Sequence, residues 1–207
     1  MKKLFLGAAI AVSSLTFAQQ FGVKGGLNVS SISKDGTLSD QGSKVGFHAG
    51  LFANFPIASS FSIQPEVLFT QYGDKFDRTY GDGTRLSWGR HLNYIAVPVM
   101  FQYNVIPNLY LEAGPEFGFL VDSKFKTKNE TTNTTTYESD LLNQYPYKKF
   151  NLGLGIGAGY WFTDNIGINA RYVAGMTDGT ENVTVGPLVF DDNSKNNVFQ
   201  VGLNYKF

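Results

Sequence analysis

The sequence predicts an all-β fold, an eight-stranded antiparallel up-and-down transmembrane β-barrel. Three observations predict it: apolar and polar residues alternate along eight segments, the connections between these segments are alternately short and long, and an export signal precedes them. Alternation with a period of two is the pattern of a strand with one apolar and one polar face. In a membrane barrel the apolar face meets lipid and the other face lines the lumen.

The first 18 residues have the pattern of a secretory signal peptide. Lys2 and Lys3 supply its positive start, residues 4–15 are mostly apolar, and the small residues Thr16 and Ala18 stand before a cleavage site. The apolar run is shorter than the roughly 20 residues that a transmembrane helix needs. We therefore expect residues 1–18 to be cleaved and residues 19–207 to form the barrel domain.

Composition narrows the class of protein. The chain has no cysteine, which excludes a lipoprotein anchor, a disulfide and a thiolate metal site. Once Lys2 and Lys3 are removed with the signal peptide, 15 basic residues stand against 17 acidic ones, a net charge of −2. Nucleic-acid binding needs a basic surface, so this balance argues against a nucleic-acid partner. No cofactor is expected.

Eight segments of 11 to 14 residues carry the alternation. Each is long enough to cross a bilayer at a tilt, for which ~9–11 residues suffice. The segments are 21–31, 45–55, 60–73, 91–104, 109–121, 149–162, 165–176 and 197–207. In the sixth segment, apolar residues from Phe150 to Phe162 alternate with Asn151 and four glycines. A helix would instead bring residues three and four apart onto one face.

The connections between these segments alternate in length. The short connections are 56–60, 105–108 and 163–165, and the long ones are 32–44, 74–90, 122–148 and 177–196. Outer-membrane barrels have tight periplasmic turns and longer outer loops, so we expect both termini in the periplasm. Residues 74–90 keep alternating around Gly81-Asp82-Gly83, and residues 183–190 do so around Gly186-Pro187. Some strands are therefore expected to continue above the membrane as β-ribbons.

Aromatic residues fall near the predicted strand ends, where amphipathic rings meet the two membrane interfaces. On the periplasmic side these are Phe21, Phe55, Phe61, Tyr103, Phe162, Tyr205 and Phe207. On the outer side they are Phe47, Tyr72, Phe119, Phe150 and Phe199. The alternating Leu203, Tyr205 and Phe207 also resemble the C-terminal assembly signal that the barrel-assembly machinery recognises.

The polar faces of the predicted strands place charged residues inside the barrel. An eight-stranded barrel is just wide enough for side chains to fill it. Buried charges are tolerable when they are paired and hydrogen-bonded, so we expect a salt-bridged plug that leaves no open pore. A path for protons or for a small solute is the alternative. The expected lumen charge cluster consists of Lys24, Glu66, Glu112, Glu116, Arg171 and Lys206, with His48 and Gln64 on the same face.

Three prolines interrupt the alternating segments. Pro65, Pro98 and Pro115 fall in three consecutive predicted strands. Proline cannot donate a hydrogen bond to a strand ladder. We therefore expect a run of β-bulges that bends one side of the barrel.

Four motifs stand out along the predicted strands. They are Ile63-Gln64-Pro65-Glu66-Val67-Leu68-Phe69 followed by Gln71, then Leu92-Asn93-Tyr94-Ile95-Ala96-Val97-Pro98-Val99, then Ala113-Gly114-Pro115 with Phe117-Gly118-Phe119, and Gly153, Gly155, Gly157 and Gly159 before Tyr160. In these motifs the chain resembles the PorT-like outer-membrane β-barrel family, the "outer membrane protein beta-barrel domain" group. That family often has a glutamate where this chain has Ala96, a departure that removes a possible interior charge. The resemblance implies an outer-membrane barrel and supplies no catalytic residues, because the family is defined by its fold.

These patterns together predict an integral protein of the cell outer membrane with a structural or interaction role of the binding or adhesion type, and not an enzyme. The expected partners are outer-membrane lipid, lipopolysaccharide and the barrel-assembly machinery, with a protein partner at the outer loops left open; the barrel is expected to be a monomer. One alternative is a lipid-modifying enzyme, for which His48 and His91 are the two candidate bases. The other is a soluble lipocalin-like periplasmic binder, whose inward face would be apolar.

Overall fold

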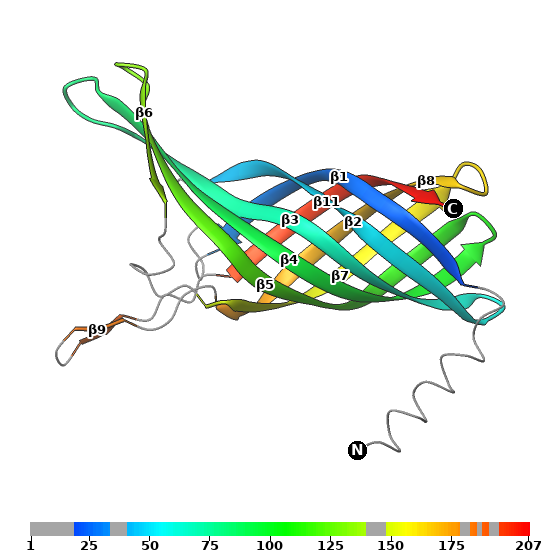
Figure 1. The fold of residues 1–207 in the computed structure, drawn as a ribbon. Coiled ribbons are helices and arrows are strands. Elements are labelled where there is room, and N and C mark those ends of the chain that lie inside the picture. Colours follow the sequence, from blue (N-terminus) through cyan, green and yellow to red (C-terminus); the bar gives the residue numbers. More distant parts are fainter. Residues whose placement is uncertain (1–18, 34–40, 140–147, 179–182, 186–187, 191–194) are drawn as a thin grey trace.

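The computed structural model shows a closed ring of antiparallel strands (Figure 1). It describes residues 19–33, 41–139, 148–178, 183–185, 188–190 and 195–207, so the expected signal peptide lies outside the described residues. The ring consists of β1 (Gln20–Ser33), β2 (Gln41–Ala58), β3 (Phe61–Thr79), β4 (Arg85–Ile106), β5 (Leu109–Asn129), β7 (Phe150–Trp161), β8 (Ile166–Asp178) and β11 (Lys195–Lys206).

Each strand of the ring pairs with two neighbours. The order is β4-β3-β2-β1-β11-β8-β7-β5, and pairing of β4 with β5 closes the ring. The eight-stranded antiparallel up-and-down barrel is thus confirmed. Three shorter strands are added: β6 (Thr134–Ser139) pairs with β5, while β9 (Val183–Val185) and β10 (Leu188–Phe190) form a separate hairpin. Within the described residues, no helix is long and apolar enough to cross a membrane.

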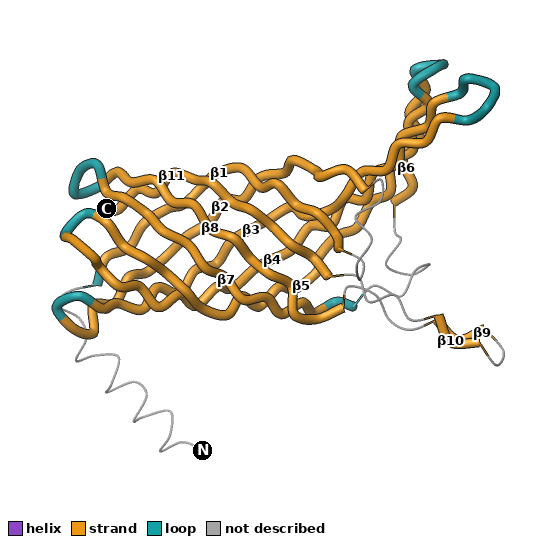
Figure 2. Tube along the Cα trace, turned by 180° about the vertical axis from the view of Figure 1, so that it is seen from behind, coloured by secondary structure: helices purple, strands orange, loops and turns teal. Residues whose placement is uncertain are grey.

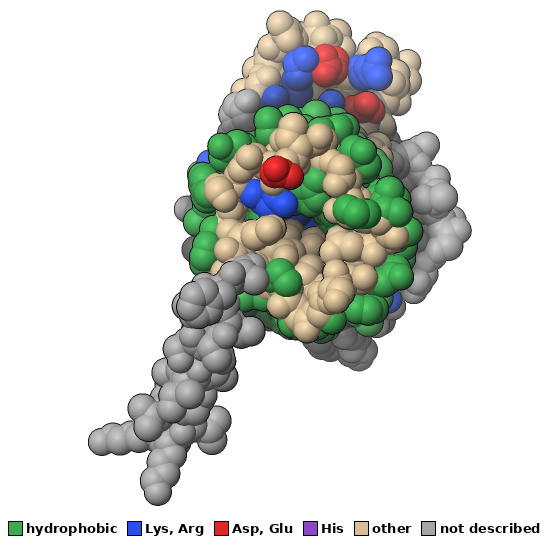
Figure 3. Space-filling view, turned by 90° about the vertical axis from the view of Figure 1, so that its right-hand side faces the viewer, with side chains coloured by type: hydrophobic (Ala, Val, Ile, Leu, Met, Phe, Trp, Pro, Cys, Tyr) green, Lys and Arg blue, Asp and Glu red, His purple; other side chains and the backbone are tan. Residues whose placement is uncertain are grey.

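Alternation in the sequence becomes alternation between the two faces of the wall. Along β11, for example, Gln200 and Asn204 are buried inside the ring, whereas Val201 and Leu203 are exposed on its outer surface. Repeated around the ring, this pattern makes an outward apolar belt around a polar interior, which Figure 3 shows from the end where the chain terminates. An apolar surface of this extent indicates contact with lipid. A lipocalin-like binder would have the opposite arrangement, with its apolar face inside.

Ten of the twelve aromatic residues expected in the two girdles are exposed on the outer surface. Phe55 is half-buried, and Tyr72 is 2% exposed and points into the lumen. The prediction for Tyr72 was wrong because the even-numbered residues of β3 face inward, as the neighbouring Thr70 does. Whether an aromatic side chain near a strand end points outward or inward therefore depends on its odd or even position along the strand, and not on its closeness to the end.

The two ends of the barrel differ. At the short-turn end, residues 59–60, 107–108 and 162–165 connect the strands, and the C-terminus lies there (Figure 1). At the opposite end β3, β4 and β5 continue well beyond the ring (Figure 2). We call the extension the ribbon: β3 from Asp74, β4 up to His91, β5 from Asp122, and β6.

The ribbon confirms one sequence expectation and corrects another. Alternation around Gly81-Asp82-Gly83 does mark a hairpin tip, since β3 ends at Thr79 and β4 starts at Arg85. Gly83 lies there at φ 82° and its N–H donates to the carbonyl of Tyr80 at 3.0 Å. Residues 122–148, however, are not a plain connection, because β5 runs to Asn129 and turns back into β6.

The strand prolines do not produce the expected bulges. The register of β3 against β4 is the same on either side of Pro65 and Pro98, although the pairs between Pro65–Val99 and Leu68–Ala96 are missing from the ladder. Proline interrupts the ladder there without inserting a residue. Register shifts occur elsewhere, for instance where β5 carries an extra residue beside Tyr94.

Candidate functional site

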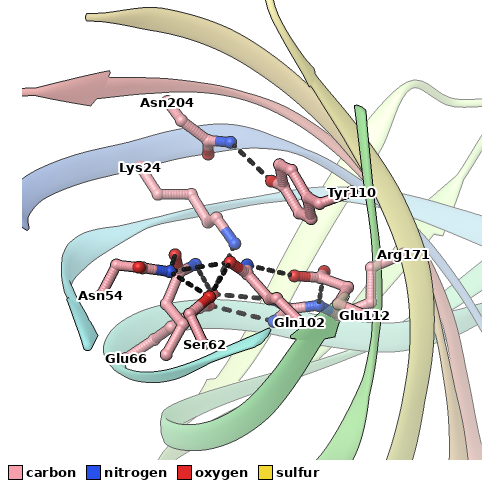
Figure 4. A network of polar contacts seen from close by, with 10 residues as sticks. Lys24, Asn54, Ser62, Glu66, Gln102, Tyr110, Glu112, Arg171 and Asn204 are labelled. Atoms are coloured by element: carbon pink, nitrogen blue, oxygen red, sulfur yellow. Dashed lines mark hydrogen bonds and ion pairs between the residues drawn. The ribbon is translucent and has the colours of Figure 1, made fainter. Parts of the chain in front are cut away.

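Four charged side chains from four strands meet inside the barrel (Figure 4). Arg171 on β8 donates from Nη1 and Nη2 to the two carboxylate oxygens of Glu66 on β3, at 3.0 and 2.8 Å. Its Nε donates to Oε1 of Glu112 on β5 at 2.7 Å. Lys24 on β1 donates from Nζ to Oε1 of Glu66 at 2.7 Å. We call these four residues the lumen network; their side chains are completely removed from solvent.

The lumen network ties together opposite walls. In the ring, three strands separate β3 from β8 whichever way one counts. The fork-shaped contact between Arg171 and Glu66 therefore spans the full width of the barrel, and bidentate geometry of this kind is the strong form of the ion pair. Two positive and two negative groups balance within the network. This balance is what allows charges to stay buried.

Glycines on β7 make room for the arginine. Glu112, Gly157 and Arg171 stand in one row across β5, β7 and β8. A Cβ on Gly157 would lie 2.5 Å from the carbonyl oxygen of Ala170 and 3.2 Å from Cβ of Arg171. A Cβ on Gly155 would lie 2.8 Å from the end of Met100 and 3.4 Å from Cδ of Arg171. The alternating glycines of the sixth predicted segment thus leave the space through which the guanidinium crosses.

Two residues of the predicted charge cluster lie apart from the lumen network. Glu116 lies two inward-facing positions nearer the ribbon than Glu112 along β5, and there it accepts a hydrogen bond from the hydroxyl of Tyr72 at 2.5 Å. Lys206 ends β11 at the short-turn rim, where its ammonium group lies 3.9 Å from the ring centre of Trp161. The expected pairing of Lys206 and Glu116 with the other charges was therefore wrong.

Alternation placed Gln64 in the lumen, but two further amides beside the lumen network, Gln102 and Asn54, were not predicted. Nε2 of Gln102 donates to Glu112 at 3.1 Å, and Nδ2 of Asn54 donates to Gln102 at 2.8 Å. Nε2 of Gln64 donates to Glu66 at 2.8 Å. These amides complete the hydrogen bonding of both carboxylates. Strand parity could have found Gln102, because it lies opposite Glu112 in the pairing of β4 with β5.

The two histidines have different surroundings. His48 is buried inside the ring, where Nδ1 is 2.7 Å from Oδ1 of Asn28. His91 lies on the ribbon beyond the apolar belt, and burial together with the nearby Lys44, Lys126 and Lys124 lowers its pKa to about 4. Over the described residues, neither histidine hydrogen-bonds to a serine or threonine hydroxyl, and no group of three metal-ligating side chains is found.

The residues of the expected assembly signal all lie on the outer face. Leu203, Tyr205 and Phe207 are exposed, and the rings of Tyr205 and Phe207 contact edge to face at 5.8 Å. The N–H of Phe207 donates to the carbonyl of Phe21 at 2.9 Å. This last bond joins the end of β11 to the start of β1.

Similar proteins are found among solved structures, while a search of curated protein sequences finds no match. Ail, the attachment invasion locus protein of Yersinia pestis, in complex with the heparin analogue sucrose octasulfate, is similar with a TM-score of 0.50 and 15% identity, over 92% of this chain and 100% of that chain. Neisserial surface protein A has a TM-score of 0.50 and 14% identity, over 92% and 99%. The outer membrane protease OmpT from Escherichia coli has a TM-score of 0.41 and 9% identity, over 91% and 96%. At these identities the likeness concerns the fold.

The family is shown by the sequence itself. A family model described as "Outer membrane protein beta-barrel domain" matches residues 17–181, which is most of the chain. Its matched region includes seven of the eight strands of the ring. The apolar belt and the closed ring agree with strands that cross a membrane. The chain therefore belongs to the outer membrane protein beta-barrel domain family.

Proposed function

We propose that the protein is a barrel without an open pore that acts through its outer surface, in a structural or binding role and without enzymatic activity. The observation that carries the first part is the lumen network. Arg171 reaches across the whole interior and is held by two carboxylates from different strands. A solute would have to break these ion pairs to pass, which leaves buried charges without partners at a cost of several kcal/mol.

Planar bilayer recording tests this proposal. The purified barrel should give no stable conductance steps across the bilayer. A variant in which Lys24, Glu66, Glu112 and Arg171 are all replaced by alanine should admit ions, since it removes the crossing side chains and leaves no charge of the lumen network without its partner. Sustained single-channel steps from the unmodified barrel would contradict the proposal.

A binding role is supported by the ribbon. β6 is the last strand of the sheet, so one edge of its backbone has no neighbouring strand among the described residues. An exposed strand edge can accept a strand from a partner protein. We propose that the ribbon faces the cell exterior and offers this edge for binding, with both termini in the periplasm.

The absence of enzymatic activity is proposed from the surroundings of the histidines. His48 contacts an asparagine deep in the lumen and His91 lies near three lysines, and among the described residues neither histidine hydrogen-bonds to the hydroxyl nucleophile that a hydrolase needs. The assay is acyl-chain release from extracted lipid A. Release that disappears in His48→Ala or His91→Ala would overturn this part and favour the alternative of a lipid-modifying enzyme.

Export and assembly complete the proposal. We propose that residues 1–18 direct export and are removed, and that the barrel-assembly machinery recognises Leu203, Tyr205 and Phe207. The outward direction of these three side chains supports recognition in a membrane setting. The four motifs described above also support a place among the PorT-like members of the family, and we propose that the barrel acts as a monomer.

A further inference from the structure

A pocket lies at the base of the ribbon. Its volume is about 400 Å³, and β2, β3, β4 and β5 all contribute to its lining. Gly89 of β4 lies in its wall, paired with Lys75 on one side and with Lys126 on the other. A Cβ on Gly89 would lie in ordinary van der Waals contact with its nearest atoms, at 3.7 to 3.9 Å, so only a side chain larger than alanine would obstruct the pocket between the two lysines.

The lining of this pocket is strongly basic. It includes Lys44, Lys75, Lys126 and Lys128 against a single carboxylate, Glu130, whose Oε2 is 2.8 Å from Nζ of Lys128. The pKa of His91, which also lines the pocket, is lowered first by burial and then by the nearby Lys44, Lys126 and Lys124. His91 is therefore neutral at pH 7 and able to hydrogen-bond, while the ammonium groups provide the charge. Lysine binds phosphate as a point charge with three donors.

The pocket opens at the margin of the apolar belt. The pairing of β4 with β3 has no register shift from Ile95 to Ser87, so His91, Gly89 and Ser87 keep the face that Ile95 turns outward. Val45, which also lines the pocket, is 66% exposed and pairs with the outward Val29 of the belt. Charged headgroups of lipid lie at this depth, directly beyond the hydrocarbon layer.

From this placement we propose that the pocket binds a phosphate group on a glycolipid of the outer leaflet. The phosphate lies between Lys75 and Lys126 over Gly89, and the acyl chains lie along the belt beside Val45. A cavity of this size accepts a phosphorylated sugar, since small-molecule sites span roughly 300–1,000 Å³. The inference deepens the proposed binding role, and it rests on the proposed orientation of the ribbon toward the outside.

The test is binding of lipid A to the folded full-length barrel in detergent, measured by native mass spectrometry. The probes are lipid A carrying both phosphates and the same lipid after dephosphorylation. The double variant Lys75→Gln, Lys126→Gln should bind the phosphorylated lipid at least about tenfold more weakly, because it loses two charge-assisted hydrogen bonds. Gly89→Leu should show a similar loss, because it fills the pocket and leaves every lysine in place.

The matched control is Lys148→Gln, Lys195→Gln, which removes the same charge at the same end of the barrel, from the residues before β7 and from the start of β11. It should bind as the unmodified protein does. Equal binding of phosphorylated and dephosphorylated lipid A, or unchanged binding by Gly89→Leu, would overturn the proposal. Dextran sulfate, used as a competitor, distinguishes a phosphorylated lipid from a soluble polyanion. If dextran sulfate binds through the same lysines and lipid A binds equally well with and without its phosphates, the ligand is a soluble polyanion and the lipid assignment is wrong. Since binding in detergent is independent of orientation, protease treatment of the ribbon on intact cells tests the proposed function separately.

Discussion

Removal of the Arg171 guanidinium provides a direct measure of the lumen network. Arg171→Met keeps most of the side-chain volume but deletes three hydrogen bonds to two buried carboxylates. Glu66 retains Lys24 as a partner, whereas Glu112 retains the amide of Gln102 and no cation within the network. Removing one partner of a buried ion pair costs about 3–5 kcal/mol. We expect a loss of this size, because at least one carboxylate is left without its counter-ion.

Unfolding by urea in lipid vesicles measures this loss, with the shift between boiled and unboiled samples on a denaturing gel as the readout of folded barrel. Ile168→Met is the matched control, because it introduces the same side chain on the same strand but on the outward face. It should change the free energy of unfolding by less than about 1 kcal/mol, as volume-conserving apolar exchanges do.

Neutralising the stranded acids should restore much of the loss. In the quadruple variant Lys24→Met, Glu66→Gln, Glu112→Gln, Arg171→Met the lumen network holds no charge, and full replacement of buried ion pairs is often close to neutral. The reasoning would be refuted by an Arg171→Met barrel as stable as the unmodified one. That result would mean that the carboxylates are neutral or hydrated in the folded lumen.

Three further predictions concern the ends of the barrel. Deletion of Phe207 should sharply lower the heat-modifiable, membrane-inserted fraction, because the aromatic end of the proposed assembly signal is lost together with the terminal bond to Phe21; an unchanged gel shift would contradict the assembly-signal interpretation. A protease added to intact cells should cut at the hairpin tip near Asp82 and leave a tag at Asn108 protected, and accessibility of the Asn108 tag instead would show the opposite topology. The imidazole of His91 should titrate near pH 4, below its ordinary pKa of 6.5, as measured by NMR. Since the unfolded chain binds this proton at higher pH, the group should lower the stability of the barrel as pH falls from 6.5 toward 4, and His91→Ala should remove that contribution.

Strand parity accounts for most of what the sequence could predict. Lys24, Glu66, Glu112 and Arg171 were all placed in the lumen from alternation, and the structure brings them together. Parity does not give the level of a residue along the barrel axis. Glu116 and Lys206 have the inward parity but lie at other levels, so their partners are Tyr72 and Trp161.

The ribbon shows a second limit of alternation. Alternation in residues 74–90 continues through the hairpin, and the ribbon there was expected. Residues 134–139 are mostly polar, with three consecutive threonines, and have no apolar face to mark a strand. β6 forms because its backbone pairs with β5 from Asn129 to Lys124. Such a strand forms through backbone hydrogen bonds to its neighbour, so its own side chains do not predict it.

The register of β8 is fixed by the burial and pairing of Arg171. A slip by one residue would move Arg171 to the lipid face, where an arginine at mid-depth costs roughly 2–4 kcal/mol. It would also turn Tyr172 inward against Gly157 and leave Glu66 and Glu112 without the guanidinium. Other side chains already lie against the remaining glycines of β7, with Val173 at Gly153, Met100 at Gly155 and Tyr110 at Gly159, so Arg171 fits best beside Gly157. Charge pairing, glycine spacing and the lipid penalty therefore select the same alignment, and the charged residues that meet in the lumen also fix the register of β8.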